Sequence, residues 1–147
     1  MNFTIENLIN SLAGVLTAQY SYPVYSSPNQ QGTDFPCFFI FLMPSIAAQQ
    51  VDNRYYRDLG IDIVFVQQHN IVNGYAEIQS IQDYLDTALE TFTYTDGTGT
   101  TQIHTYEREA STEDDELHYK FHIRQRVSLP YTPNPMNEME ENNVSIN

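Results

Sequence analysis

The residues best suited to chemistry in this chain are its four histidines, but their spacing argues against a shared metal ion. His118 and His122 are four positions apart in a stretch where apolar and polar residues alternate, as they do in a strand. Four steps along a strand separate two side chains by about 13 Å, which is too far for two ligands of one ion. His104 lies on a neighbouring predicted strand and His69 in a predicted loop. We therefore interpret the histidines as ordinary residues of a sheet surface.

Nucleophilic and acid–base catalysis are also disfavoured. The single cysteine, Cys37, lies in the apolar run at residues 35–43, where an apolar setting disfavours the reactive thiolate, so we expect a small buried hydrophobic residue. Asp58 and Asp62 are as far apart as the two histidines and do not form an acid–base pair. The turn at residues 95–99 is not followed by a lysine and is therefore not a phosphate loop. The sequence thus predicts no catalytic residues, no metal and no cofactor.

Charge limits the partners of the protein. The chain of 147 residues carries 6 basic and 19 acidic residues, a net charge of -13. Such a surface disfavours direct binding to nucleic acid phosphates, but it is compatible with a protein that DNA passes without binding to it. Nine of the acids lie in residues 107–116 and 138–141, which we interpret as a solvated loop and a polar tail. The longest apolar run is about half of a membrane span and no signal pattern opens the chain, so we expect no membrane and synthesis in the cytoplasm.

Two apolar strands, predicted at residues 35–43 and 54–67, form the centre of the sheet that positions the other side chains. In the second strand, one face carries Tyr55, Leu59, Ile61, Ile63 and Phe65, and the other carries Tyr56, Asp58, Asp62 and Val64. The first set predicts a core face and the second a polar face. Val24 and Tyr25 are a candidate edge strand, and residues 47–53 are a connector to which the sequence assigns no helix or strand.

Two amphipathic helices are predicted to cover one face of this sheet. The first spans residues 4–20, with Thr4 as its N-cap and Glu6 in its first turn. Its apolar residues recur at helical spacing, namely Ile5, Leu8, Ile9, Leu12, Leu16 and Tyr20. The second helix starts after the candidate N-cap Asn73, and its apolar stripe consists of Ile78, Ile81, Leu85, Ala88, Leu89 and Phe92.

Two further strands are predicted at residues 101–109 and 117–129. If the acidic loop at residues 111–116 closes an antiparallel hairpin between them, Ala110 faces Leu117. This register places Glu107 opposite Lys120 and Glu109 opposite His118.

The predicted fold is an α+β domain over residues 1–130 in the order α-β-β-α-β-β. Its sheet is antiparallel or mixed, with about four to five strands, and both helices pack on one face. Residues 131–147 form a polar acidic tail, which is either flexible or an arm onto a neighbouring subunit.

Several short motifs and the amphipathic first helix occur in the order of a known family. The motifs are FPCFFI at residues 35–40, NRYYR at 53–57, IDI at 61–63 and LHYKFHI at 117–123. In this respect residues 1–130 resemble the tail terminators of tailed phages and prophages of Gram-positive bacteria. The resemblance implies a structural virion protein that forms a ring, expected to be a hexamer, on the head-proximal end of the tail tube. Such a ring stops tube polymerisation and provides the surface for joining to the head connector.

The partners implied by this resemblance are further copies of the chain, the tail tube protein, the head connector or neck protein, and the tail sheath if the tail is contractile. DNA would pass through the lumen without specific binding. A neck or tail-completion protein, which joins head and tail, is the alternative function. A small enzyme or ligand-binding domain is a third candidate, but the spacing of the polar residues gives it no convergent site.

Arg54, Tyr55, Tyr56 and Arg57 are the candidate subunit interface. Two arginines beside two tyrosines at the start of a strand suit pairing with acids of a neighbouring subunit. Pairing within the chain, with nearby aspartates or the first helix, is the alternative. The eleven tyrosines of the chain likewise suit either surfaces buried in an assembly or ordinary core and boundary positions.

Overall fold

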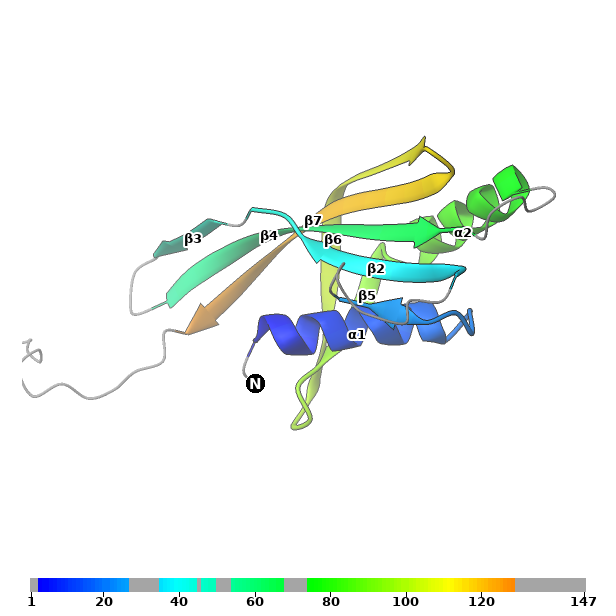
Figure 1. The fold of residues 1–147 in the computed structure, drawn as a ribbon. Helices are drawn as coiled ribbons and strands as arrows, with labels where there is room; N and C mark the ends of the chain where they lie inside the picture. The colour runs from blue at the N-terminus through cyan, green and yellow to red at the C-terminus, as the bar shows by residue number, and fades with distance from the viewer. Residues whose placement is uncertain (1–2, 27–34, 45, 50–53, 68–73, 129–147) are drawn as a thin grey trace, which may run out of the picture.

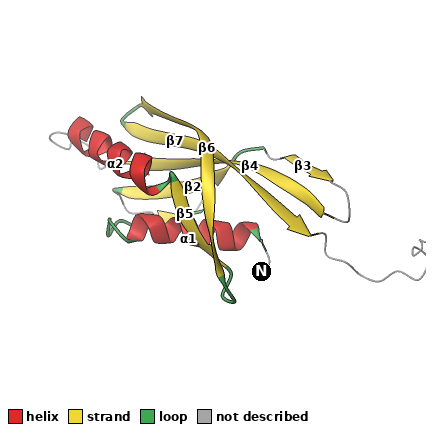
Figure 2. Ribbon diagram, turned by 180° about the vertical axis from the view of Figure 1, so that it is seen from behind, coloured by secondary structure: helices red, strands yellow, loops and turns green. Residues whose placement is uncertain are grey.

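The computed structural model describes residues 3–26, 35–44, 46–49, 54–67 and 74–128 (Figure 1; Figure 2). These residues form two helices and seven strands. In chain order the elements are α1 (Ile5–Thr17), β1 (Val24–Tyr25), β2 (Cys37–Leu42), β3 (Ile46–Gln49), β4 (Arg54–Val66), α2 (Gly74–Ala88), β5 (Thr91–Thr95), β6 (Thr100–Glu113) and β7 (Glu116–Ser128). The predicted α+β class is confirmed. The predicted order α-β-β-α-β-β is wrong, because it leaves out β1, β3 and β5.

The sheet is mixed, with the strand order β1-β2-β4-β7-β6-β5. β3 pairs with β4 next to β2 and lies off this path. β1 runs parallel to β2, whereas the other pairs are antiparallel. β4 and β7 pair along their full length, from Arg54 opposite Ser128 to Val66 opposite Glu116. These two strands therefore form the spine of the fold, and the predicted count of four to five strands is too low.

α1 starts where its sequence predicts. The side-chain oxygen of Thr4 accepts a hydrogen bond from the backbone amide of Asn7 at 3.1 Å, which confirms Thr4 as the N-cap. α1 ends at Thr17 rather than at Tyr20. The Tyr20 ring packs instead beside Phe38 of β2, with 5.7 Å between the ring centroids.

α2 is shorter than predicted because its apolar stripe runs into β5. Ile78, Ile81 and Leu85 are the buried residues of the helix, which ends at Ala88. Phe92, assigned to the stripe by its spacing, belongs to β5, where Phe92 and Tyr94 are buried between exposed or half-buried threonines. The predicted N-cap Asn73 lies outside the described residues.

The core lies between one face of the sheet and the two helices. Its fully buried members include Leu8, Leu12 and Leu16 of α1, Leu59, Ile61, Ile63 and Phe65 of β4, and Leu117, Tyr119, Phe121 and Ile123 of β7. The predicted core face of β4 is therefore confirmed over residues 59–65. Val64 is also buried although it belongs to the opposite face, where it lies between Phe39 of β2 and His118 of β7.

The β6–β7 hairpin differs from its predicted register. Its turn consists of Asp114 and Asp115, whose φ values of 52° and 64° are those of a two-residue type I′ turn. The acidic segment therefore belongs to the strands, and the predicted loop at residues 111–116 is wrong. Ala110 faces Tyr119 rather than Leu117, and Glu109 faces Lys120. The predicted pairs Glu107–Lys120 and Glu109–His118 are also wrong. The slip of two positions leaves Glu109 and Ala110 on their predicted faces.

A β-bulge bends β6 near its middle. The register of β6 on β7 shifts between Tyr106 and Glu109, and Glu107 has a φ of 53°. Residues 100–104 of β6 pair with β5, and from Thr105 onwards β6 pairs with β7, on both sides of the bulge. In Figure 2, β5 and the first part of β6 lie beside α1. The Ser11 side chain accepts a hydrogen bond from the Thr95 amide at 3.2 Å, so the bend lets the sheet wrap around α1.

Candidate functional site

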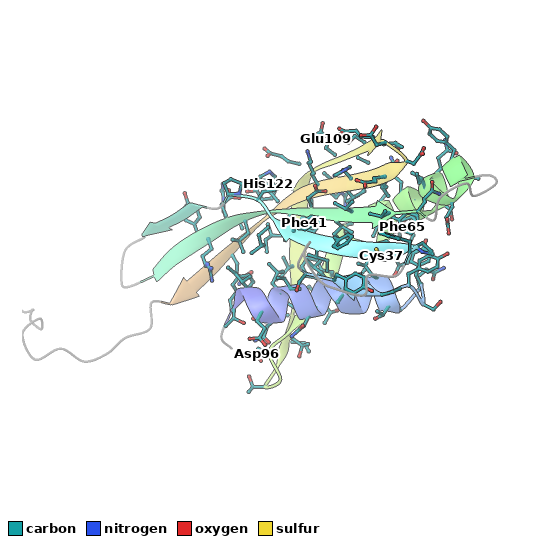
Figure 3. All side chains as sticks on the ribbon, in the orientation of Figure 1. Cys37, Phe41, Phe65, Asp96, Glu109 and His122 are labelled. Atoms are coloured by element: carbon teal, nitrogen blue, oxygen red, sulfur yellow. The ribbon has the colours of Figure 1, made fainter. Side chains whose placement is uncertain are left out.

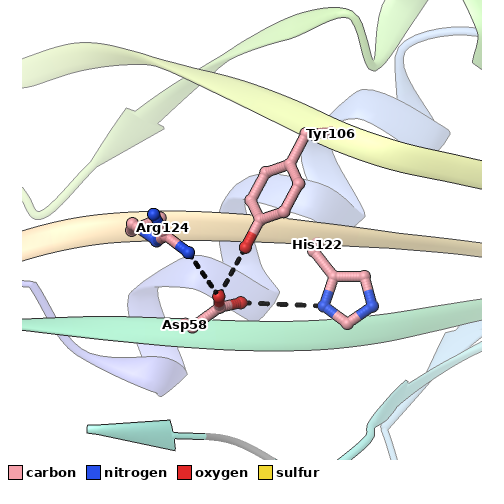
Figure 4. A network of polar contacts seen from close by, with 4 residues as sticks. All are labelled: Asp58, Tyr106, His122 and Arg124. Atoms are coloured by element: carbon pink, nitrogen blue, oxygen red, sulfur yellow. Dashed lines mark hydrogen bonds and ion pairs between the residues drawn. The ribbon is translucent and has the colours of Figure 1, made fainter. Parts of the chain in front are cut away.

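The face of the sheet turned away from the helices carries a polar network around Asp58 (Figure 4). The Tyr106 hydroxyl donates a hydrogen bond to Asp58 Oδ2 at 2.5 Å, and Arg124 Nη2 donates to the same oxygen at 3.2 Å. His122 Nδ1 lies 3.6 Å from Asp58 Oδ1. The network thus joins β4, β6 and β7 through side chains as well as through the backbone ladder.

These contacts hold Asp58 in its charged form. The hydrogen bond from Tyr106, with support from Arg124, lowers the pKa of the Asp58 carboxyl below its ordinary value. Burial and the hydrogen bond to Asp58 raise the pKa of Tyr106 to about 12. Both shifts favour the arrangement in which the tyrosine donates and the carboxylate accepts. The network is therefore suited to fixing structure, because neither group titrates near neutral pH.

A second acidic side chain on the same face, Asp62, is paired with a histidine. His118 Nδ1 lies 3.1 Å from Asp62 Oδ2, and His118 Nε2 lies 3.3 Å from Glu116 Oε1. The other oxygen, Asp62 Oδ1, is buried and has no hydrogen-bond partner within the described part of the chain. Figure 3 shows His122 and Glu109 on this same side of the sheet.

The histidines of this face were predicted as surface residues, and Asp58 and Asp62 as solvated or ion-paired carboxylates, but the partners of these aspartates were not predicted. The signal for this pairing is the match between acids on the polar face of β4 and bases on the polar face of β7. It becomes informative only once the register of the two strands is known. Within the part of the chain that the structure describes, no three His, Cys, Asp or Glu side chains gather as a metal site requires. His104 contacts Thr91 Oγ1 at 3.0 Å, and His69 lies outside the described residues.

One end of the sheet extends past the core as a three-stranded arm, which we define as β3, residues 54–58 of β4 and residues 124–128 of β7. β3 pairs with β4 from Ile46 opposite Asp58 to Gln49 opposite Tyr55. β2 leaves β4 at Ile61 and β6 leaves β7 at Ile123, so neither strand reaches the arm. Figure 1 shows the arm projecting beyond the N-terminal end of α1, on the side away from α2.

Comparison with known protein families shows to which family the chain belongs. A family model described as "Phage tail terminator protein" matches residues 7–134. The chain belongs to the phage tail terminator family. The resemblance read from the sequence motifs is thereby confirmed at the level of the family. No curated protein matches the chain.

Tail terminators are structural proteins of the phage virion and not enzymes, which fits a site built from paired charges rather than from a reactive pocket. Cys37 is fully buried, as the sequence predicts for a small hydrophobic residue. Among the described residues, no helix has the length and apolar character needed to span a membrane.

The candidate interface residues of this tail terminator all lie in the arm. Tyr56 lies on the outer face, where the Arg124 guanidinium is 5.0 Å from its ring centroid. Arg57 lies on the opposite face, where its guanidinium is 5.8 Å from the ring centroid of Phe3 just before α1. The side chains of Arg54 and Tyr55 lie outside those described, and their backbones pair with Ser128 and Val127.

Most tyrosines in the described region of the terminator serve its own fold. The Tyr119 hydroxyl donates to Asp86 Oδ1 at 2.6 Å and the Tyr22 hydroxyl donates to Glu77 Oε2 at 2.6 Å. Both bonds fasten α2 to the rest of the domain. Tyr25 lies on the other face of the sheet, where its ring packs against that of Phe39 of β2 with 5.6 Å between the ring centroids.

Proposed function

We propose that this chain assembles as a ring, expected to be a hexamer, on the head-proximal end of the phage tail tube. The ring stops the addition of further tube subunits and presents the surface to which the head connector or neck protein joins. The observation that carries this proposal is the family match over residues 7–134, which spans almost the whole domain. The tail sheath is a further partner if the tail is contractile.

The charge of the chain supports a ring that DNA traverses. With a net charge of -13, the protein repels phosphates rather than binding them. A ring lumen of this character would let DNA pass without specific contacts. The alternative, a neck or tail-completion protein that joins head and tail, suits a small acidic domain equally, so the two functions are separated by tail length and not by charge.

The geometry of the sheet supports the arm as the subunit interface. Both helices pack on the inner face, so the outer face and the arm are left uncovered by helices. Arg54, Tyr55, Tyr56 and Arg57 are the interface candidates within it. Tyrosine and arginine are among the residue types that contribute most to the binding free energy of protein–protein interfaces.

The function is tested by deleting the gene from its phage and measuring tails by electron microscopy. Loss of a terminator gives tubes of abnormal, heterogeneous length, and supplying the wild-type protein restores a uniform length. Tails of normal length that fail to join heads would refute termination and favour the neck or tail-completion function.

The interface candidates are tested by Arg54→Ala, with Gln79→Glu as the control. Gln79 is exposed on α2, outside the arm, and its replacement changes the net charge by the same amount. We expect Arg54→Ala to weaken ring assembly and Gln79→Glu to leave it intact. Intact rings of Arg54→Ala at both low and high salt would remove Arg54 from the interface.

A further inference from the structure

The arm and the β6–β7 hairpin carry opposite charge. The chain has 6 basic residues, and four of them are arginines of the arm, namely Arg54, Arg57, Arg124 and Arg126. Asp58 is the single acid within the arm, and it is paired with Arg124 at 3.2 Å. Residues 107–116 hold six carboxylates and one arginine, and all of these carboxylates except that of the half-buried Glu116 are exposed.

These two charged regions cannot neutralise each other within one molecule. β7 has 13 residues, begins at the hairpin turn and ends in the arm. Its two ends are therefore about 40 Å apart, which is about five Debye lengths at physiological ionic strength. Because β7 is paired to β4 along its whole length, it cannot fold back to bring them together.

The arm is also open to a partner at its edges. Among the described residues, no strand pairs with the outer edge of β3 or with the side of residues 124–128 that β6 has left. The sequence of β3, Ile-Ala-Ala-Gln, contains neither a charge nor a proline, the residues that usually protect an edge strand. A second copy of the chain offers the complement to this basic, open-edged arm, because it brings the acidic hairpin.

We infer that the arm of one copy binds the acidic β6–β7 hairpin of the next copy, head to tail. This inference rests on the proposed function and names the contact that would build the ring. The two contacting surfaces are different, so each copy offers one of each and the contact repeats from copy to copy. Such a heterologous contact closes into a ring when the rotation between copies allows it.

The dependence of assembly on salt has opposite signs for this contact and for net charge alone. Copies that each carry -13 repel one another, so net charge alone predicts that salt strengthens association. A contact between the basic arm and the acidic hairpin predicts instead that salt weakens association. We expect the association of the full chain, measured by sedimentation equilibrium, to weaken at least about tenfold between about 0.05 and 0.5 M NaCl.

Charge reversal at each surface identifies the contact. The arm variant is Arg54→Glu with Arg126→Glu, and the hairpin variant is Glu109→Lys with Glu113→Lys. The arm variant changes the net charge of the arm from +3 to -1, and the hairpin variant changes that of residues 107–116 from -5 to -1. Each variant alone therefore loses the charge complementarity of the contact and should associate at least about tenfold more weakly than the wild type. An equimolar mixture should form heterodimers, because the unaltered arm of the hairpin variant meets the unaltered hairpin of the arm variant. Far-ultraviolet circular dichroism verifies that both variants are folded.

The control reverses two exposed acids outside the hairpin, Asp83→Lys with Glu90→Lys. It changes the net charge by the same amount as the hairpin variant, and it should associate as well as the wild type or better. A wild-type chain that stays monomeric at low salt overturns the inference, as does a folded arm or hairpin variant that associates like the wild type, or a mixture that stays monomeric. The proposed function fails separately, by normal tail lengths in the deletion phage.

Discussion

Removal of the Tyr106 hydroxyl tests whether the Asp58 network stabilises the sheet. Tyr106→Phe keeps the ring and its contact with His122, whose centroid lies 5.7 Å away, and removes only the hydrogen bond to Asp58. Asp58 is mostly buried, with 19% of its side chain exposed, so water replaces the lost donor only in part. The carboxylate then remains charged with one strong donor fewer.

The expected cost follows from the type of hydrogen bond. A bond to a charged group contributes about 1.5–3 kcal/mol, and partial access of water reduces the loss here to about 1–2 kcal/mol. For a chain of this size, that corresponds to a fall in Tm of about 3–6 °C. Urea unfolding followed by circular dichroism measures the free energy directly, provided that the slope with denaturant is unchanged.

The pH dependence separates this effect from a general packing defect. The pKa of Asp58 is lowered in the folded protein, so its contribution to stability is complete above its unfolded pKa of about 3.9. That contribution is lost as the pH falls through the folded value. The stability difference between wild type and Tyr106→Phe should therefore be constant from pH 7 to about 5 and shrink below about pH 4.

Tyr75→Phe is the matched control for Tyr106→Phe, because Tyr75 is 67% exposed on α2 and its hydroxyl loss should cost less than about 0.5 kcal/mol. A Tyr106→Phe protein as stable as this control would refute the role of the network. So would a difference that persists unchanged at low pH.

Three other substitutions probe the core, the central strand and the hairpin turn, each by urea unfolding. Leu12→Ala should cost about 2–5 kcal/mol because Leu12 is fully buried under the sheet, and a cost below about 1 kcal/mol would contradict that placement. Gly60→Val should cost about 1–3 kcal/mol because a Cβ at Gly60 would lie 2.8 Å from Met43 Cε and 3.2 Å from His122 Cε1; an unchanged stability would mean that both side chains move aside freely. Asp115→Gly should stabilise by about 0.5 kcal/mol, because glycine adopts the φ of 64° without a steric cost, and a loss of stability would argue against the type I′ turn.

The parts of the fold that follow a single period were predictable from the sequence. Thr4 and the leucines of α1 fit a 3.6-residue period alone, and residues 54–67 fit a two-residue period alone. Both elements are found where predicted, within a few residues. Local spacing determines such elements because each buries one continuous face.

Elements that fit two periods, or that depend on partners, were missed. Leu85, Leu89 and Phe92 continue a helical spacing, while Phe92 and Tyr94 alternate as in a strand, so the start of β5 could not be told from the end of α2. The register of β6 depends on a bulge with a positive φ at Glu107, where no glycine marks the position. The Asp58 network depends on the register of three strands, which no local pattern contains.

These strand registers also explain why a subunit contact at the arm should change the local stability of the fold. Among the described side chains, the buried apolar residues of β4 and β7 nearest the arm are Leu59 and Ile123, and the arm projects beyond the N-terminal end of α1. The root of the arm is held by its backbone ladder and by the Asp58 network instead. A few paired strands that no helix covers are only marginally stable by themselves, so binding of a neighbouring copy at the arm should stabilise it. Binding of a neighbouring copy should therefore protect the backbone amides of residues 54–58 from hydrogen exchange more than those of residues 61–65, which the core already protects. Equal changes in both segments would refute this coupling.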